Sequence, residues 1–203
     1  MNIAEHLPDK IYLIDMSSRL AEEWTKAFSS DDRFEVVHGD YFSVPADAMV
    51  SPANSFGHMD GGLDLAIRHK LGHDLEKNVK DVILKKHHGQ LPVGCAEIIS
   101  TSHESWRFLI CAPTMWVPEN VAGTVNTYLA FRAILYSVVD FNARQTIKKI
   151  NSLVCPGLGT GVGGMPPDRC ARQMATAYED VLRTPKTLGW GQIQALHRGL
   201  IEP

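Results

Sequence analysis

Short apolar runs rich in β-branched residues alternate along this chain with longer segments that have helical spacing. The strand-like runs are IYLID (11–15), FEVVHGD (34–40), DAMVSPAN (47–54), CAEIIS (95–100), RFLICAP (107–113) and KINSLVCPG (149–157). Helical spacing is found at 20–28, 63–71, 75–87 and 121–142, and again after Pro166 and Pro167, which suit the first turn of a helix. Such alternation predicts an α/β fold with a mostly parallel sheet covered by helices on both faces. The segment 184–203 is only weakly patterned.

Composition places the chain among ordinary globular proteins. It has 203 residues, of which 44% are hydrophobic and 21% charged, so we expect one domain spanning 1–203. No apolar run approaches the roughly 18 residues that cross a bilayer, and the N-terminus lacks the features of a secretory signal. We therefore expect a soluble, cytoplasmic protein without a membrane partner. The net charge of −3 argues against binding duplex nucleic acid through a broad basic surface.

The cysteine and histidine patterns give no sign of a metal, a cofactor or a covalent nucleophile. The four cysteines are widely spaced and form no CxxC pair, which favours reduced thiols packed in the core. His69 and His73 are four residues apart, but Gly72 intervenes and the glutamate of an HExxH motif is missing. No GxSxG motif occurs, and no cysteine has a recognisable histidine partner.

Two glycine-bearing loops, each between a strand-like run and a helical segment, carry most of the functional information. The first is SPANSFGHMDGGLD (51–64) and the second is PGLGTGVGGMPP (156–167). In parallel sheets such loops lie at the carboxyl ends of strands, and their N–H groups can bind an anion together with a helix N-terminus. Tight turns that need positive φ are the alternative for a single glycine pair. Five glycines within 157–164 instead favour a ligand with two linked phosphates.

The common nucleotide-binding motifs do not account for these loops. Gly159, Gly161 and Gly164 match GxGxxG, but a Rossmann domain needs this motif early in the chain, with an acidic residue on a following strand. Here the motif lies near the C-terminus, and Glu179 falls in a helical segment. A Walker loop is excluded because no glycine is followed by Lys and then Ser or Thr.

The order of these motifs resembles the macro domains, a family that binds ADP-ribose. VSPAN (50–54), Gly61-Gly62 and Leu63-Asp64 are similar to the family's first loop, and GTGVGGMP (159–166) is similar to its second phosphate loop. Upstream, Gly39-Asp40 matches a Gly-Asp pair whose acid accepts a hydrogen bond from the adenine amino group. LPVGCAEII (91–99) is similar to a Pro-x-Gly segment before a central strand. The resemblance covers about 34–182.

This resemblance implies a three-layer macro-domain fold with a mixed, mostly parallel sheet between helices. It assigns ligand binding to Asp40, Tyr41, Asn54, Gly61, Gly62, Gly159, Thr160, Gly161, Val162, Gly163 and Gly164. The chain departs from the family pattern at Ser51 and Pro52 and at 59–60. Where the family often carries an aromatic residue against the distal ribose, Gly163 and Met165 stand here, so we expect a distal end that is more open or differently shaped.

Three residues of the first loop are candidates for chemistry. Asn54 could orient the hydroxyls of a distal ribose, although an Asx turn would also explain it. Asp64 could position water or act as general base, although an acid is favoured in the first turn of any helix. His58 could protonate a leaving group, or it could be an exposed loop histidine. Asp60 could supplement Asp64 or simply be solvated.

We therefore expect a protein that binds ADP-ribose and hydrolyses a derivative at the distal ribose. The substrate would be ADP-ribose 1″-phosphate or an ADP-ribosyl ester, and the partner would be ADP-ribose, a derivative of it or an ADP-ribosylated protein. The second loop looks more like that of phosphatase-type relatives. The alternative is a non-catalytic reader of free or protein-linked ADP-ribose.

Overall fold

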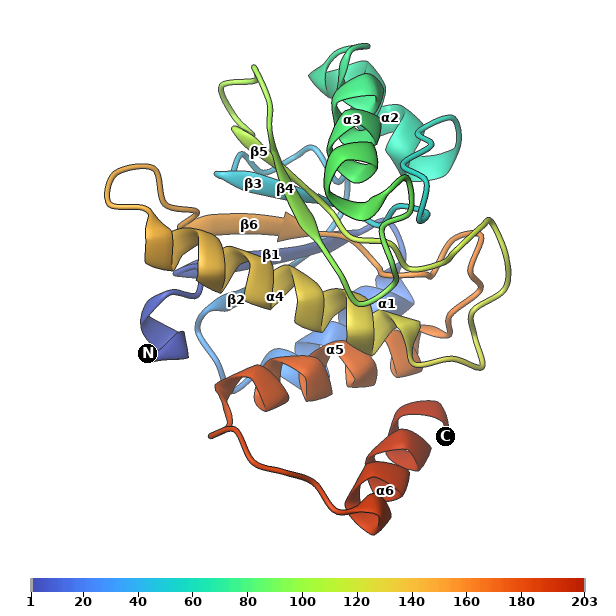
Figure 1. Cartoon of the computed structure of the whole chain (residues 1–203). Coiled ribbons are helices and arrows are strands. Elements are labelled where there is room, and N and C mark those ends of the chain that lie inside the picture. Colours follow the sequence, from blue (N-terminus) through green and yellow to red (C-terminus); the bar gives the residue numbers. More distant parts are fainter. Residues whose placement is uncertain (1, 203) are drawn as a thin grey trace.

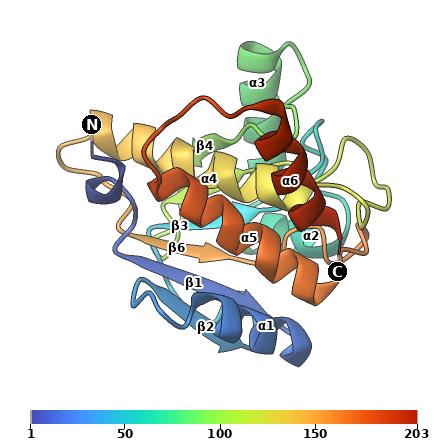
Figure 2. The same cartoon turned by 90° about the horizontal axis from the view of Figure 1, so that it is seen from below.

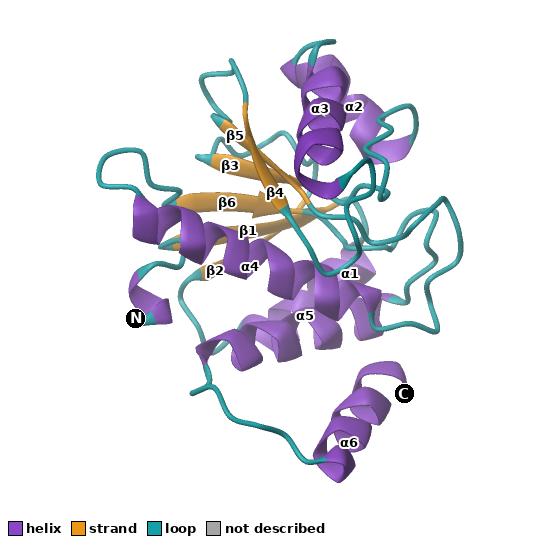
Figure 3. Ribbon diagram, in the orientation of Figure 1, coloured by secondary structure: helices purple, strands orange, loops and turns teal. Residues whose placement is uncertain are grey.

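A computed structural model, which describes residues 2–202, contains one six-stranded sheet in the order β2-β1-β6-β3-β5-β4 (Figures 1 and 3). The strands are β1 (Lys10–Asp15), β2 (Phe34–His38), β3 (Ala48–Ser51), β4 (Glu97–Ser100), β5 (Phe108–Cys111) and β6 (Ser152–Cys155). All neighbouring strands pair in parallel except β4, which is antiparallel to β5. The carboxyl ends of β2, β1, β6, β3 and β5 therefore lie along one edge of the sheet.

Helices cover both faces of this sheet. Figure 1 shows α1 (Ser18–Phe28), α4 (Asn126–Arg144) and α5 (Pro167–Leu182) on one face, and α2 (Gly62–Leu71) and α3 (Leu75–His87) on the other. A short 3-10 helix (Ile3–Glu5) precedes β1. Helix α6 (Trp190–Ile201) packs outside α5, as the view from below shows (Figure 2), and Gln173 Nε2 of α5 donates to the Leu200 carbonyl at 3.0 Å.

The strands divide their side chains between two hydrophobic cores. Leu13 of β1 and Val50 of β3 belong to the core beneath α1, α4 and α5, whereas the adjacent Ile14 and Met49 belong to the core beneath α2 and α3. This alternation follows from the two-residue period of a strand. Because the central strands are buried on both faces, their sequences are continuous apolar runs.

The α/β class and the mixed, mostly parallel sheet between helices are confirmed. Ser17 caps α1 by accepting the N–H of Leu20 at 3.3 Å, and α2 ends at Gly72, whose φ is +113°. Two predictions need correction. Helix α4 begins at Asn126 rather than Val121, because the Val121 N–H donates to the Gly163 carbonyl at 2.8 Å and the chain then turns. The weakly patterned C-terminal segment contains α6.

The four cysteines are free thiols, and three of them are buried. Burial raises the pKa of Cys170 to about 12 and also raises the pKa values of Cys111 and Cys155, so these thiols stay protonated and pack as small apolar groups. Within residues 2–202, no helix combines the length and the apolar character that a membrane span requires.

Buried Asn142 joins α4 to two other segments and gives a test of the fold. Its Nδ2 donates to the carbonyls of His6 and Ile150 at 2.9 Å each, and its Oδ1 accepts the Ile150 N–H at 2.8 Å. Asn142→Ala leaves these groups unpaired, so we expect the free energy of unfolding to fall by at least about 2 kcal/mol. Denaturant unfolding measures the loss. Asn78→Ala, on the exposed side of α3, is the matched control and should cost less than about 0.5 kcal/mol; equal losses would contradict the assignment.

Candidate functional site

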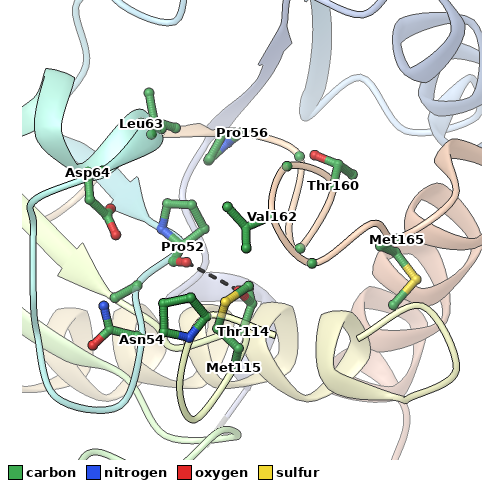
Figure 4. A pocket seen from close by; sticks show the side chains of 18 of the residues that line it. Pro52, Asn54, Leu63, Asp64, Thr114, Met115, Pro156, Thr160, Val162 and Met165 are labelled. Atoms are coloured by element: carbon green, nitrogen blue, oxygen red, sulfur yellow. Dashed lines mark hydrogen bonds between the residues drawn. The ribbon is translucent and has the colours of Figure 1, made fainter. Parts of the chain in front are cut away.

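A crevice lies at the point where the segments that follow neighbouring strands lead to helices on opposite faces of the sheet. After β3 the chain runs to α2 on one face, whereas after β6 and β5 it runs to α5 and α4 on the other (Figure 1). The loops that follow β3 and β6 therefore diverge, as is usual at ligand sites in parallel sheets. They enclose a cavity of about 470 Å³ at the carboxyl edge (Figure 4).

Four strand ends supply the cavity wall. From β1 and the start of α1 come Asp15, Ser17 and Leu20; from the loop after β3 come Pro52, Ala53, Asn54, His58 and residues 60–64; from the segment after β5 come Thr114, Met115 and Pro118; and from the loop after β6 come Pro156, Gly157, residues 159–163, Met165 and Pro167. Both glycine loops predicted from the sequence thus face one cavity.

Most glycines of the second loop have a structural reason. A Cβ at Gly163 would lie 2.5 Å from the Gly159 carbonyl oxygen, and one at Gly157 would lie 2.4 Å from Thr160 Oγ1. Gly159 and Gly164 have positive φ, so a side chain there would be strained. Turn geometry therefore explains two of the five glycines, and close contacts within the protein explain two more. Only Gly161 has an ordinary φ and open space where a side chain would project.

Both loops present backbone N–H groups without protein acceptors. Within residues 2–202, the N–H groups of 159–163 donate to no protein atom. The first turn of α2 likewise has no side-chain cap at Gly61, and its first intrahelical bond is donated by Leu65. Such donors, with the positive end of the α2 dipole, suit an anionic ligand.

Asp64 is a partly buried carboxylate on the cavity wall. It lies in the first turn of α2, and its Oδ1 accepts the Ser51 hydroxyl at 2.6 Å. Burial raises its pKa from 3.8 to about 6; the nearby Asp60 carboxylate raises it further, while the hydrogen bond from Ser51 opposes the change. A carboxylate with a pKa near neutrality is suited to accepting a proton from water.

Asn54 and His58 line the same cavity, but the Asn54 amide is engaged within its own loop. Its Nδ2 donates to the His58 carbonyl at 2.9 Å, and its Oδ1 accepts the N–H groups of Phe56 and His58 at 3.1 and 3.3 Å. The Asx-turn alternative thus describes the geometry of Asn54. The His58 ring is exposed, and its Nδ1 lies 3.0 Å from Lys80 Nζ.

Three residues assigned by resemblance do not line the cavity. Asp40 is exposed, and its Oδ1 accepts the Phe42 N–H at 3.1 Å in a turn after β2. Tyr41 is buried, and its hydroxyl donates to the carbonyls of Val50 and Val154 and accepts the Val50 N–H. Gly164 closes the second loop through a hydrogen bond from its N–H to the Gly161 carbonyl.

Sequence reasoning missed Asp15, Ser17 and Ser51. The Asp15 carboxylate accepts the N–H groups of Ser17 at 2.9 Å and Gly157 at 3.3 Å, which ties the end of β1 to the second loop. Ser51 is the last residue of β3 and holds Asp64. All three lie at or shortly after the carboxyl end of a strand, and this position would have identified them as candidate site residues.

The raised pKa of Asp64 predicts a pH-dependent stability. Because the folded state holds this proton more tightly than the unfolded state, the ionised carboxylate lowers stability increasingly as pH rises from about 4 to about 6. At 1.36 kcal/mol for each unit of difference between 3.8 and about 6, the cost above pH 7 is up to about 3 kcal/mol. Asp64→Asn should therefore be more stable than wild type at pH 7.5.

Denaturant unfolding at pH 7.5 and 4.5 measures this advantage, which should shrink at the lower pH. Asp32→Asn is the control, because that side chain is exposed to solvent and the change should have the same small effect at both pH values. An Asp64→Asn advantage that does not depend on pH would show that burial does not perturb this carboxyl group.

Comparisons with known proteins agree with this geometry. The family model described as "Macro domain" matches residues 50–174. An uncharacterized protein of Aquifex aeolicus is 32% identical over 140 residues, which are 69% of this chain and 77% of that protein. Another, from Aeropyrum pernix, is 34% identical over 153 residues, 75% of this chain and 74% of its own.

Solved structures share the fold. The macrodomain of Mycobacterium tuberculosis DarG superposes with a TM-score of 0.58 at 17% identity, covering 70% of this chain and 88% of its own. The Oceanobacillus iheyensis macrodomain with ADP gives a TM-score of 0.58 at 23% identity, covering 71% and 74%. Because the family model matches more than half of the chain and includes both glycine-bearing loops, the chain belongs to the macro domain family.

Proposed function

We propose that this protein binds ADP-ribose and hydrolyses an ADP-ribose derivative at the distal ribose, with the whole chain acting as one domain. Membership of the macro domain family supports the ligand, as do related structures that contain ADP or ADP-ribose. The cavity supports the reaction, because it combines N–H groups suited to a diphosphate with a partly buried carboxylate.

The order of strands along the edge gives the ligand a direction. The free N–H groups after β6 and at the start of α2 flank the middle of the cavity, where the diphosphate would lie. The adenosine would extend toward the β1 end, beside Asp15 and with Asp40 beyond it in the turn after β2. The distal ribose would then lie at the β3 and β5 end, beside Asp64 and His58.

The observation that carries the proposal is the pair Gly61 and Gly161. Each has an ordinary φ and open space around the position of a Cβ, so neither is needed for the fold. They lie in different loops, and both line the cavity. A side chain at either position would project into the region that a diphosphate needs, because the backbone must approach the phosphates closely.

Gly161→Glu tests this arrangement directly. The protein should fold normally, and the introduced carboxylate should repel the diphosphate, so we expect the affinity for ADP-ribose to fall at least tenfold. Isothermal titration calorimetry measures it, and AMP should bind much more weakly than ADP-ribose to wild type. Gly161→Gln is the neutral control of equal size and should lose less affinity. Unchanged binding in folded Gly161→Glu would place the ligand elsewhere.

Asp64 has the properties that the chemical step requires. In the proposed reaction its carboxylate takes a proton from a water molecule while the water oxygen attacks C1″. The bond between C1″ and the substituent breaks, and the leaving oxygen receives a proton, for which His58 is the candidate donor. N–H groups fixed near the leaving oxygen would stabilise the negative charge that develops on it in the transition state.

Asp64→Asn should therefore slow turnover without weakening ligand binding. We expect kcat to fall by roughly 10²–10⁴, because the variant cannot accept the proton. Affinity for ADP-ribose should stay level or rise, since a negative charge near the diphosphate is removed. The assay measures release of ADP-ribose from ADP-ribose 1″-phosphate and from an ADP-ribosylated protein. Turnover that survives in Asp64→Asn would exclude Asp64 as the base; no turnover by wild type on either substrate would favour a reader.

A further inference from the structure

An aromatic pair, in which Trp116 is exposed and Phe56 is partly buried, joins the segments that follow β3 and β5. The rings of Phe56 and Trp116 are 5.7 Å apart between centroids, and Trp116 is 55% exposed. Two hydrogen bonds hold the two segments together, because the Ser55 N–H donates to the carbonyls of Met115 at 3.1 Å and Trp116 at 3.2 Å. We call Phe56, Trp116 and the partly exposed Val117 the aromatic rim.

The aromatic rim belongs to two chain segments whose flanking residues line the cavity. Trp116 and Val117 lie between Met115 and Pro118, which both line the cavity, and Phe56 lies between the lining residues Asn54 and His58. By the strand order, this is the end assigned to the distal ribose, so a group attached to C1″ would leave the cavity across the rim.

The charges at this end favour an uncharged substituent on the ribose. Among the lining residues in the described part of the chain, the charged side chains are Asp15, Asp60 and Asp64, with His58 as the sole titratable base and no Lys or Arg. Lys80, 3.0 Å from His58, is paired with Glu76 at 2.6 Å. A phosphate on C1″ would thus meet two carboxylates without a free cation in the wall.

We propose that the aromatic rim binds an apolar side chain that neighbours the modified residue of an ADP-ribosylated polypeptide. This inference rests on the proposed function and names the substrate class for the same site. A polypeptide is favoured over a nucleic acid because the two segments that carry the rim also carry the acidic residues Asp60 and Glu119, which would repel a phosphate backbone. Exposed tryptophan beside a pocket is a typical anchor for an apolar partner group.

The experiment compares two ADP-ribosylated peptides that differ only beside the modified residue, which is leucine in one and serine in the other. In both peptides an amide replaces the ester that the proposed reaction would hydrolyse. The peptide therefore stays intact while its binding is measured. Wild type should bind the leucine peptide about tenfold more tightly, as burial of one apolar side chain implies. Trp116→Ala should lose this preference and keep its affinity for free ADP-ribose within twofold.

The matched control is Trp190→Ala. Trp190 is 72% exposed at the start of α6, which packs outside α5 (Figure 2), and no residue of α6 lines the cavity, so this variant should behave as wild type. Tight binding of ADP-ribose with no leucine preference, or a preference that survives Trp116→Ala, would overturn the proposed role of the aromatic rim but not the proposed function. Tighter binding of an ADP-ribosylated single-stranded oligonucleotide than of the leucine peptide would overturn the polypeptide assignment. Failure of wild type to bind ADP-ribose would overturn both proposals.

Discussion

The direction in which the chain leaves β3 determines the rest of the site. Its two neighbours in the sheet, β5 and β6, are followed by helices on one face, whereas β3 is followed by α2 on the other. Loops that start side by side must then separate, and the space between them cannot be filled by either helix layer. The cavity, the exposed N–H groups of the second loop and the position of Asp64 all follow from this one divergence.

The same divergence explains why the site costs stability. Asp64 lies in the first turn of α2, where a helix dipole favours an acid, yet the start of α2 also faces a crevice that excludes most solvent around the carboxyl group. A single hydroxyl, that of Ser51, offsets part of the desolvation. An asparagine would fill the same space and accept the same hydrogen bond without the charge. A partly buried carboxylate beside an anion site is therefore poorly explained by folding alone.

The sequence located the two loops because that inference needed only local information. Each loop can be placed at a strand end because it lies between a β-branched run and a helical segment and contains several glycines. Asp64 and Gly161 were identified as candidates by their positions in these loops. The roles of Asp15 and Asp40 depended on strand order, which is not local. Since β1 lies between β2 and β6, Asp15 contacts the second loop and Asp40 lies one strand further away. Helix α6 was missed because Leu200 is its one buried residue, which gives almost no periodic signal.

Residue type alone did not separate structural from functional positions within the loops. Asn54 has the chemistry to orient a sugar, but its own loop uses both acceptor positions of Oδ1 and one N–H of Nδ2, so these hydrogen bonds hold the backbone that carries His58. Gly159 is required by a positive φ, whereas Gly161, two residues later, is required by nothing within the protein. Where a residue faces the cavity and the fold does not require its type, we expect ligand binding to determine which residue stands there. By this criterion Gly61 and Gly161, together with the Asp64 carboxylate, are the positions that the proposed ligand would best explain, whereas the hydrogen bonds of Asn54 already hold its own loop.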